Sequence, residues 1–228
     1  MAVPVHAQSE APKIEAPKIA EPMVFDLVRP LGAKRGELEV NTLAQRNLGG
    51  SHRPIEWAPE IEYAFADGYA VELELPLEGR HITDYKLGLQ GTFGTFKGGK
   101  AIHGIQYLGL HNRNQEQWES SLLYIVGVRH SKRVSTLSMA GIGDVAIRKL
   151  SDRSLLFNHT TFYDLNQETT VGLELNVSHG RERSVQLMPQ VQRNLKKNLQ
   201  LQTGLGAIRE TGQSWQPRFG LRLIRQLK

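Results

Sequence analysis

Glutamates recur at even-numbered positions of EWAPEIEYAFADGYAVELELPLE, residues 56–78, and apolar side chains fill most odd positions. Successive side chains of a β-strand point to opposite faces, so this alternation predicts one acidic face and one apolar face. The acidic residues are Glu56, Glu60, Glu62, Glu72 and Glu74. The apolar residues are Trp57, Ile61, Tyr63, Phe65, Tyr69, Val71, Leu73 and Leu75.

Basic side chains elsewhere are candidate counter-charges to this acidic wall. If the strand parities hold, they are Lys86, Arg129, Arg148, Arg218 and Arg222, and Glu174 adds a carboxylate on a later strand. One hypothesis is a crossed network of acids and bases that fills a barrel and neutralises its buried charge. The other is a narrow pore whose transverse field orients a polar or zwitterionic solute. Passive diffusion through such a pore needs no catalytic residue.

The residue types of enzymes and metal centres are present but do not form a coherent pattern. Ser154, Asn158 and His159 suggest the hydrolase arrangement of outer-membrane phospholipase A, but His159 has the opposite strand parity to the other two. The eight histidines are scattered, so a histidine site for a metal would need several loops to converge. Cysteine is absent, which excludes thiolate chemistry and disulfides. We predict no enzymatic activity, no cofactor and no metal site.

The overall composition excludes several classes of protein. The 228 residues include 28 basic and 23 acidic side chains spread along the chain, so no nucleic-acid-binding patch is expected. No apolar run approaches the roughly 18 residues that a membrane-spanning helix needs. A β-barrel in a membrane is compatible with this composition, because only alternate residues of its strands must be apolar.

From residue 37 onward, short alternating segments are separated by turn residues. We predict twelve strands, at 37–48, 55–65, 69–76, 84–94, 101–111, 117–129, 134–148, 154–163, 169–178, 183–192, 198–208 and 215–225. For the first hairpin, a three-residue loop at Ala66–Gly68 would pair Phe65 with Tyr69, Tyr63 with Val71 and Glu62 with Glu72. Equivalent strands joined by short loops are typical of a single up-and-down antiparallel barrel.

The strand pattern fits a membrane barrel better than a soluble one. An even strand number, strands near the 9–11 residues that cross a bilayer, and aromatic residues near strand ends all favour the membrane form. The apolar faces are nearly free of charge, and an Arg or Lys near the bilayer midplane would cost about 2–4 kcal/mol. We therefore predict an all-β transmembrane barrel whose glutamates face a wet lumen and whose odd-numbered residues face lipid.

Two sequence stretches resemble small bacterial outer-membrane barrel transporters of the type linked to the phenol-degradation pathway. They are EWAPEIEYAFADGYAVELELPLEG and MPQVQRNLKKNLQLQTGLGA, the latter at residues 188–207, and the resemblance extends over most of residues 37–228. The resemblance implies uptake of small molecules, including apolar or aromatic ones, across the outer membrane of a Gram-negative bacterium. The partners it implies are outer-membrane lipid and a small solute.

The first 36 residues differ in composition from the barrel. Residues 1–8 end in the small-x-small step Val5-His6-Ala7, which is typical of a signal-peptide cleavage site. The tandem repeat EAPKIEAPKI then predicts a flexible, extended tail over residues 9–36. The barrel is expected to occupy residues 37–228.

The predicted function is passive diffusion of small molecules through a monomeric outer-membrane channel. One alternative is a soluble, lipocalin-like periplasmic barrel that binds a ligand against inward-facing apolar residues. Others are a porin for acidic oligosaccharides, which would need a mainly basic lumen, and a structural barrel plugged by its own charges.

Overall fold

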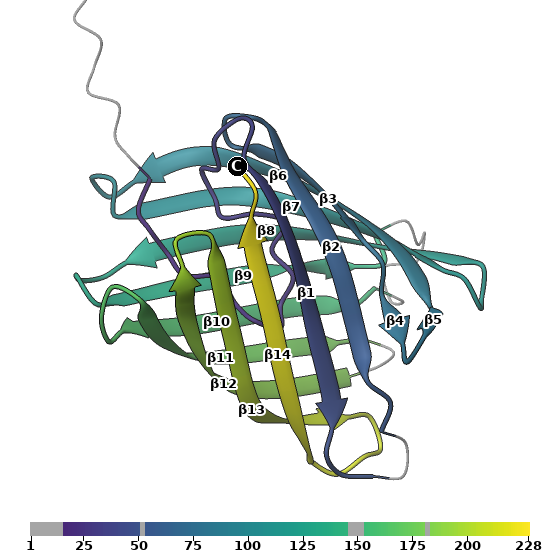
Figure 1. Cartoon of the computed structure of the whole chain (residues 1–228). Coiled ribbons are helices and arrows are strands. Elements are labelled where there is room, and N and C mark those ends of the chain that lie inside the picture. The colour runs from purple at the N-terminus through teal and green to yellow at the C-terminus, as the bar shows by residue number, and fades with distance from the viewer. Residues whose placement is uncertain (1–15, 51–52, 146–152, 181–182) are drawn as a thin grey trace, which may run out of the picture.

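The computed structural model describes residues 16–50, 53–145, 153–180 and 183–228, and all regular structure in these ranges is β-strand (Figure 1). Twelve antiparallel strands form a ring that closes where β1 pairs with β14, which confirms the predicted fold class. The strands are β1 (Leu38–Asn47), β2 (Glu56–Ala66), β3 (Tyr69–Glu74), β6 (Asp84–Phe96), β7 (Ala101–Asn112), β8 (Gln117–Arg129), β9 (Val134–Gly143), β10 (Leu155–Asp164), β11 (Thr169–His179), β12 (Arg183–Lys196), β13 (Leu199–Glu210) and β14 (Gln216–Gln226).

Connections of different length lie at the two ends of the barrel. One end, the turn end, carries the tight turns such as that between β2 and β3, together with the start of β1 and the end of β14. The other, the loop end, carries the β1–β2 connection and a small hairpin between β3 and β6. This hairpin, β4 (Leu77–Glu78) and β5 (His81–Ile82), was not predicted from the sequence, because its arms are too short to show alternation.

The first hairpin follows the predicted register except at its tip. Tyr63 pairs with Val71 and Glu62 with Glu72, as the alternation indicates. The predicted pairing of Phe65 with Tyr69 is wrong, because the register shifts after Ala64 and Ala66 pairs with Tyr69 instead. Phe65 is the extra residue of a β-bulge, which leaves a loop of only Asp67 and Gly68. Gly68 has a φ of 78°, which favours glycine.

The barrel wall has an apolar outer face. Seven of the predicted outer residues, Trp57, Ile61, Tyr63, Phe65, Tyr69, Leu73 and Leu75, are exposed, and Val71 is half-buried. Phe93, Tyr124, Phe157, Leu205 and Phe219 continue this surface around the ring. The part of the chain that the structure describes contains no helix long and apolar enough to cross a membrane.

Residues 16–36, which we call the inserted segment, lie inside the barrel (Figure 1). The sequence had predicted a flexible, extended tail over residues 9–36. The segment enters at the turn end, where Lys18 contacts Arg129, and dips to Asp26, which contacts Lys86 at the start of β6. It returns to the turn end, where the Gly68 N–H donates to the carbonyl of Ala33 at 2.8 Å. The predicted signal remnant at residues 1–8 lies outside the described residues.

Candidate functional site

Glu174, on β11, anchors the middle of the inserted segment. Its carboxylate accepts hydrogen bonds from the backbone N–H groups of Met23 at 2.8 Å, Val24 at 3.1 Å and Phe25 at 2.6 Å. The Gln190 side-chain amide donates to it at 2.9 Å and that of Asn176 at 3.1 Å. Glu174 is fully buried. The N–H groups directed at its carboxylate stabilise the negative charge in place of water.

Glutamines on neighbouring strands hold the remaining backbone of the segment. Gln106 accepts from the Val28 N–H at 2.9 Å and donates to the Asp26 carbonyl at 2.8 Å. Gln90 donates to the Arg29 carbonyl at 2.6 Å, and Gln192 donates to the Glu21 carbonyl at 2.6 Å. These glutamines lie on the polar face of the wall. Their side chains form the hydrogen bonds that the backbone N–H and C=O groups of the segment would otherwise form in a helix or sheet.

Glycines on the inner wall leave room for side chains of the segment. A Cβ added at Gly88 would lie 2.5 Å from a methyl carbon of Val28, and one at Gly127 would lie 2.4 Å from a methyl carbon of Ile19. A Cβ at Gly220 would lie 2.7 Å from the Met23 terminal methyl. A Cβ at Gly204 on β13 would lie equally close to Met23, and one at Gly104 on β7 would lie 2.7 Å from a methyl carbon of Leu31. Glycines on five strands therefore leave space for the segment. The wall is shaped to the segment as well as hydrogen-bonded to it.

An apolar cluster fills the side of the lumen formed by β8, β9 and β10. Leu27 of the segment packs with the buried side chains Leu123, Ile125, Leu137, Met139 and Phe162. Sequence reasoning missed this cluster because it assigned the inner face from its polar members. The signal was present in β8, where LLYIVGV is apolar on both faces, as expected for a strand covered on both sides.

The opposite side of the lumen carries the predicted charges. Arg222 pairs with Glu60 at 2.7 Å, and Lys86 contacts Glu72 at 3.1 Å and also Glu74. Arg29, from the inserted segment, pairs with Glu39 at 3.1 Å, with Glu37 at 3.1 Å and with Glu62 at 3.5 Å. Sequence reasoning did not include Arg29 or Asp26, because both fell in the predicted tail.

The remaining predicted charges lie away from this cluster or outside the described residues. Glu56 is exposed near the loop end and pairs with Arg218, which is buried. At the turn end, Arg129 pairs with Asp164 at 2.6 Å and donates to the Lys18 carbonyl. Arg148 lies outside the described residues. The structure therefore separates the predicted charges into a large group near Glu60 and smaller pairs at the two ends.

The residues of the rejected hydrolase arrangement lie on different faces. Asn158 is buried in the lumen and contacts Asn176. His159 lies on the outer face, where its ring contacts Ser138 at 2.8 Å. Ser154 is at the loop end, next to Asp144 at 3.5 Å. The three side chains cannot act on one substrate in this arrangement.

Glu21 is an ionisable group of the inserted segment, outside the twelve strands of the barrel wall. Burial, followed by the nearby charge of Glu39, raises the pKa of its carboxyl to about 7. The positive charges of Arg222 and Arg29 act in the opposite direction. One carboxyl oxygen of Glu21 is buried without a hydrogen-bond partner.

Two cavities lie at opposite ends of the lumen. The larger, about 910 Å³, is at the turn end, where Lys18, Glu21, Arg129 and Gln192 contribute to its lining. The smaller, about 350 Å³, is at the loop end and is bordered by Glu56 and Glu74. The inserted segment and its partners occupy the interior between them.

The fold is similar to solved outer-membrane barrels. The porin KdgM in complex with disordered oligogalacturonate has 10% sequence identity and a TM-score of 0.65 over 83% of this chain and 99% of its own. The porin NanC has 11% identity and a TM-score of 0.66 over 83% and 100% of the two chains. The COG4313 outer-membrane channel from Pseudomonas putida F1 has 12% identity and a TM-score of 0.66 over 89% and 100%.

No curated protein matches the chain. A family model described as HAEPLYID-like matches residues 16–214, a range that includes the inserted segment and nearly the whole barrel. The chain belongs to the HAEPLYID-like family.

Proposed function

We propose that the protein is an outer-membrane channel for passive diffusion of small solutes, with the inserted segment closing its lumen in this conformation. The observation that carries the proposal is a closed barrel with an apolar outer face and a lumen that is polar outside the apolar cluster and is crossed by residues 16–36. The similarity of fold to known outer-membrane channels supports it. The barrel closes on itself through β1 and β14, so we propose a monomer in lipid.

The lumen favours polar solutes. The cavity at the turn end is bordered by amides such as Gln192 and Asn194 and by the charges of Arg129, Lys196 and Asp164. Such groups hydrogen-bond to hydroxylated or charged solutes, whereas the apolar or aromatic solutes implied by the phenol-degradation resemblance would leave them unpaired. The lysines at the turn end favour an acidic solute there, but the carboxylates near Glu60 oppose its passage to the loop end. A lipocalin-like barrel would instead direct its apolar residues inward.

The function is tested by tethering the inserted segment to the wall. Met23 and Gly220 are replaced by cysteine, because the Met23 terminal methyl lies 2.7 Å from the Cβ position of Gly220 and the chain has no other cysteine. A short thiol-cleavable bifunctional reagent then links the pair in protein folded into liposomes. We expect entry of small neutral and charged sugars to fall on cross-linking and to recover on reduction.

Wild-type protein treated with the same reagent is the control and should be unaffected. Equal flux before and after cross-linking would show that solutes do not pass where the segment lies. No flux in any state would contradict the channel and favour a plugged structural barrel.

A further inference from the structure

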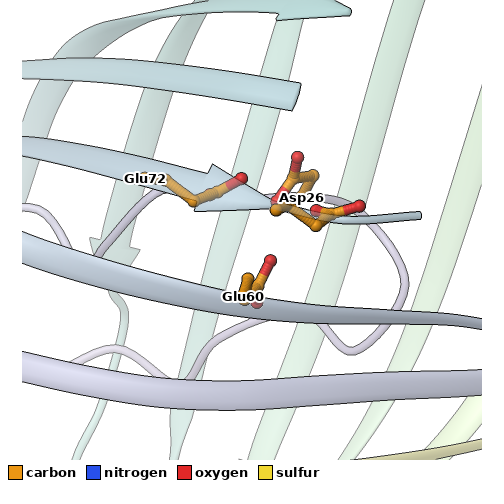
Figure 2. A group of neighbouring side chains, drawn as sticks. Asp26, Glu60 and Glu72 are labelled. Carbon is orange, nitrogen blue, oxygen red and sulfur yellow. The ribbon is translucent and has the colours of Figure 1, made fainter. Parts of the chain in front are cut away.

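Four carboxylates from three separate stretches of chain converge near the loop end. Asp26, at the deepest point of the inserted segment, approaches Glu60 on β2 and Glu72 on β3 (Figure 2). Glu74, also on β3, completes the group. One oxygen atom from each residue lies within 4.8 Å of the corresponding oxygens of the other three. Glu60, Glu72 and Glu74 are buried, so the group is shielded from bulk water.

Glu72 contributes a buried carboxylate to which no hydrogen bond is donated. Its side chain is fully buried and points toward Asp26 and Glu60 (Figure 2). Neither of its carboxylate oxygens accepts a hydrogen bond, although Lys86 Nζ lies 3.1 Å from one of them. Lys86 is shared among three carboxylates, so a further cation would lower the cost of burying Glu72 without hydrogen bonds.

The local charges do not balance. Lys86 contacts Asp26, Glu72 and Glu74, and Arg222 pairs with Glu60 at 2.7 Å. These two bases face four carboxylates, so two negative charges remain when all of them are ionised. Arg222 also lies 3.7 Å from Glu62, so its charge is not available to Glu60 alone. Arg29 pairs with Glu39 and Glu62 and adds no positive charge to the group of four. One divalent cation would restore neutrality to the group of four.

The donor atoms and their spacing select the kind of cation. An all-oxygen carboxylate set suits a hard cation. Calcium binds oxygen at 2.3–2.6 Å, so ligands on opposite sides of the ion are about 4.6–5.2 Å apart, against about 4.0–4.2 Å for magnesium. All four oxygens lie within 4.8 Å of one another, a spacing that one calcium ion can span. Glu74 also borders the cavity of about 350 Å³ at the loop end, so one member of the group faces that cavity.

We propose that Asp26, Glu60, Glu72 and Glu74 bind one calcium ion, which ties the inserted segment to β2 and β3. Calcium and the Lys86 ammonium group then compete for the same carboxylates. The scattered histidines gave no sign of this site, and its carboxylates come together only because Asp26 lies in the lumen. Calcium binding at this site does not depend on solute passage. If the protein binds no calcium there, the channel proposal is unaffected.

Calcium binding is measured by equilibrium dialysis of radioactive calcium against folded protein in detergent, after EDTA has been added and removed. Heat-modifiable migration confirms that each variant is folded. We expect about one calcium ion per wild-type chain, and at least tenfold weaker binding by Glu72→Gln. Glu168→Gln is the charge-matched control, because Glu168 is exposed at the turn end, and it should bind as the wild type does.

Lys86→Met distinguishes calcium binding from a purely structural role of the carboxylates. Removing the competing ammonium should strengthen calcium binding several-fold, while magnesium at equal concentration should compete weakly. Absence of calcium binding by the folded wild-type protein would overturn the proposal. Equal binding by wild type and folded Glu72→Gln would overturn it as well, because the ion would then be held elsewhere.

Discussion

Glu174 lies far along the chain from the residues it holds, 151 positions after Met23. Its alternation with Leu173 and Leu175 was enough to place it on the polar face of its strand, toward the lumen. Its partners could not be predicted, because they are backbone N–H groups of a segment without periodicity. At the residue scale, sequence therefore indicates which way a side chain points more reliably than what it contacts.

Glu174→Gln should loosen the inserted segment. A glutamine offers one acceptor oxygen where the carboxylate offers two, so at least one backbone hydrogen bond to a charged group is lost, at about 1.5–3 kcal/mol each. We expect faster entry of small sugars into liposomes than with wild type, and Glu116→Gln, at an exposed position between β7 and β8 that lines neither cavity, should leave the rate unchanged. A lowered melting temperature with unchanged flux would instead assign Glu174 to barrel stability alone.

At the scale of elements, the twelve barrel strands were predictable because most of them repeat the two-residue period over about the length that crosses a bilayer. The predicted strand 117–129 coincides with β8, and most other boundaries differ from the structure by a few residues. The inserted segment was not predictable in this way. EAPKIEAPKI has the composition of a solvated linker, and its continuation gains its order from Gln90, Gln106 and Gln192, which lie on distant strands.

The opposite faces of β3 should respond oppositely to substitution. Leu73 is exposed on the outer face, and its replacement by arginine places a charge against lipid at a cost of about 2–4 kcal/mol near the midplane. Glu72→Gln keeps the volume of the side chain and removes a buried charge. In lipid vesicles, Leu73→Arg should reduce the heat-modifiable folded fraction, whereas Glu72→Gln should fold as wild type does. Equal yields would contradict the assignment of the outer face to lipid.

At the scale of the whole molecule, the barrel has a core, and the N-terminal segment supplies part of it. Leu27 joins the side chains of three strands, while Arg29 joins the charges of β1 and β2. Alternation along the strands predicted the ring and its two faces. It could not show that the lumen is filled, because a lumen-facing glutamine has the same pattern whether it meets water or a buried peptide backbone. The stability of the barrel should therefore depend on groups of the segment.

Glu21 makes this dependence measurable as a function of pH. The pKa of its carboxyl is raised by burial from 4.5 to about 7, with Glu39 and Glu60 raising it and Arg222 and Arg29 lowering it. Between these two values the folded protein binds more protons than the unfolded chain does, so the contribution of Glu21 to stability falls as pH rises from 4.5 to 7. This contribution to stability is fully present below pH 4.5, and it changes little above pH 7.

Glu21→Gln mimics the protonated carboxyl and should remove this contribution to the pH dependence while other lumen groups still titrate. The melting temperatures of wild type and variant in detergent should be close at pH 4.5, and the wild type should fall below the variant as pH approaches 7. Curves that stay parallel over this range would show that Glu21 titrates alike in the folded and unfolded chains. They would also mean that the effect of burial on Glu21 is either absent or fully offset by the charges of Arg222 and Arg29.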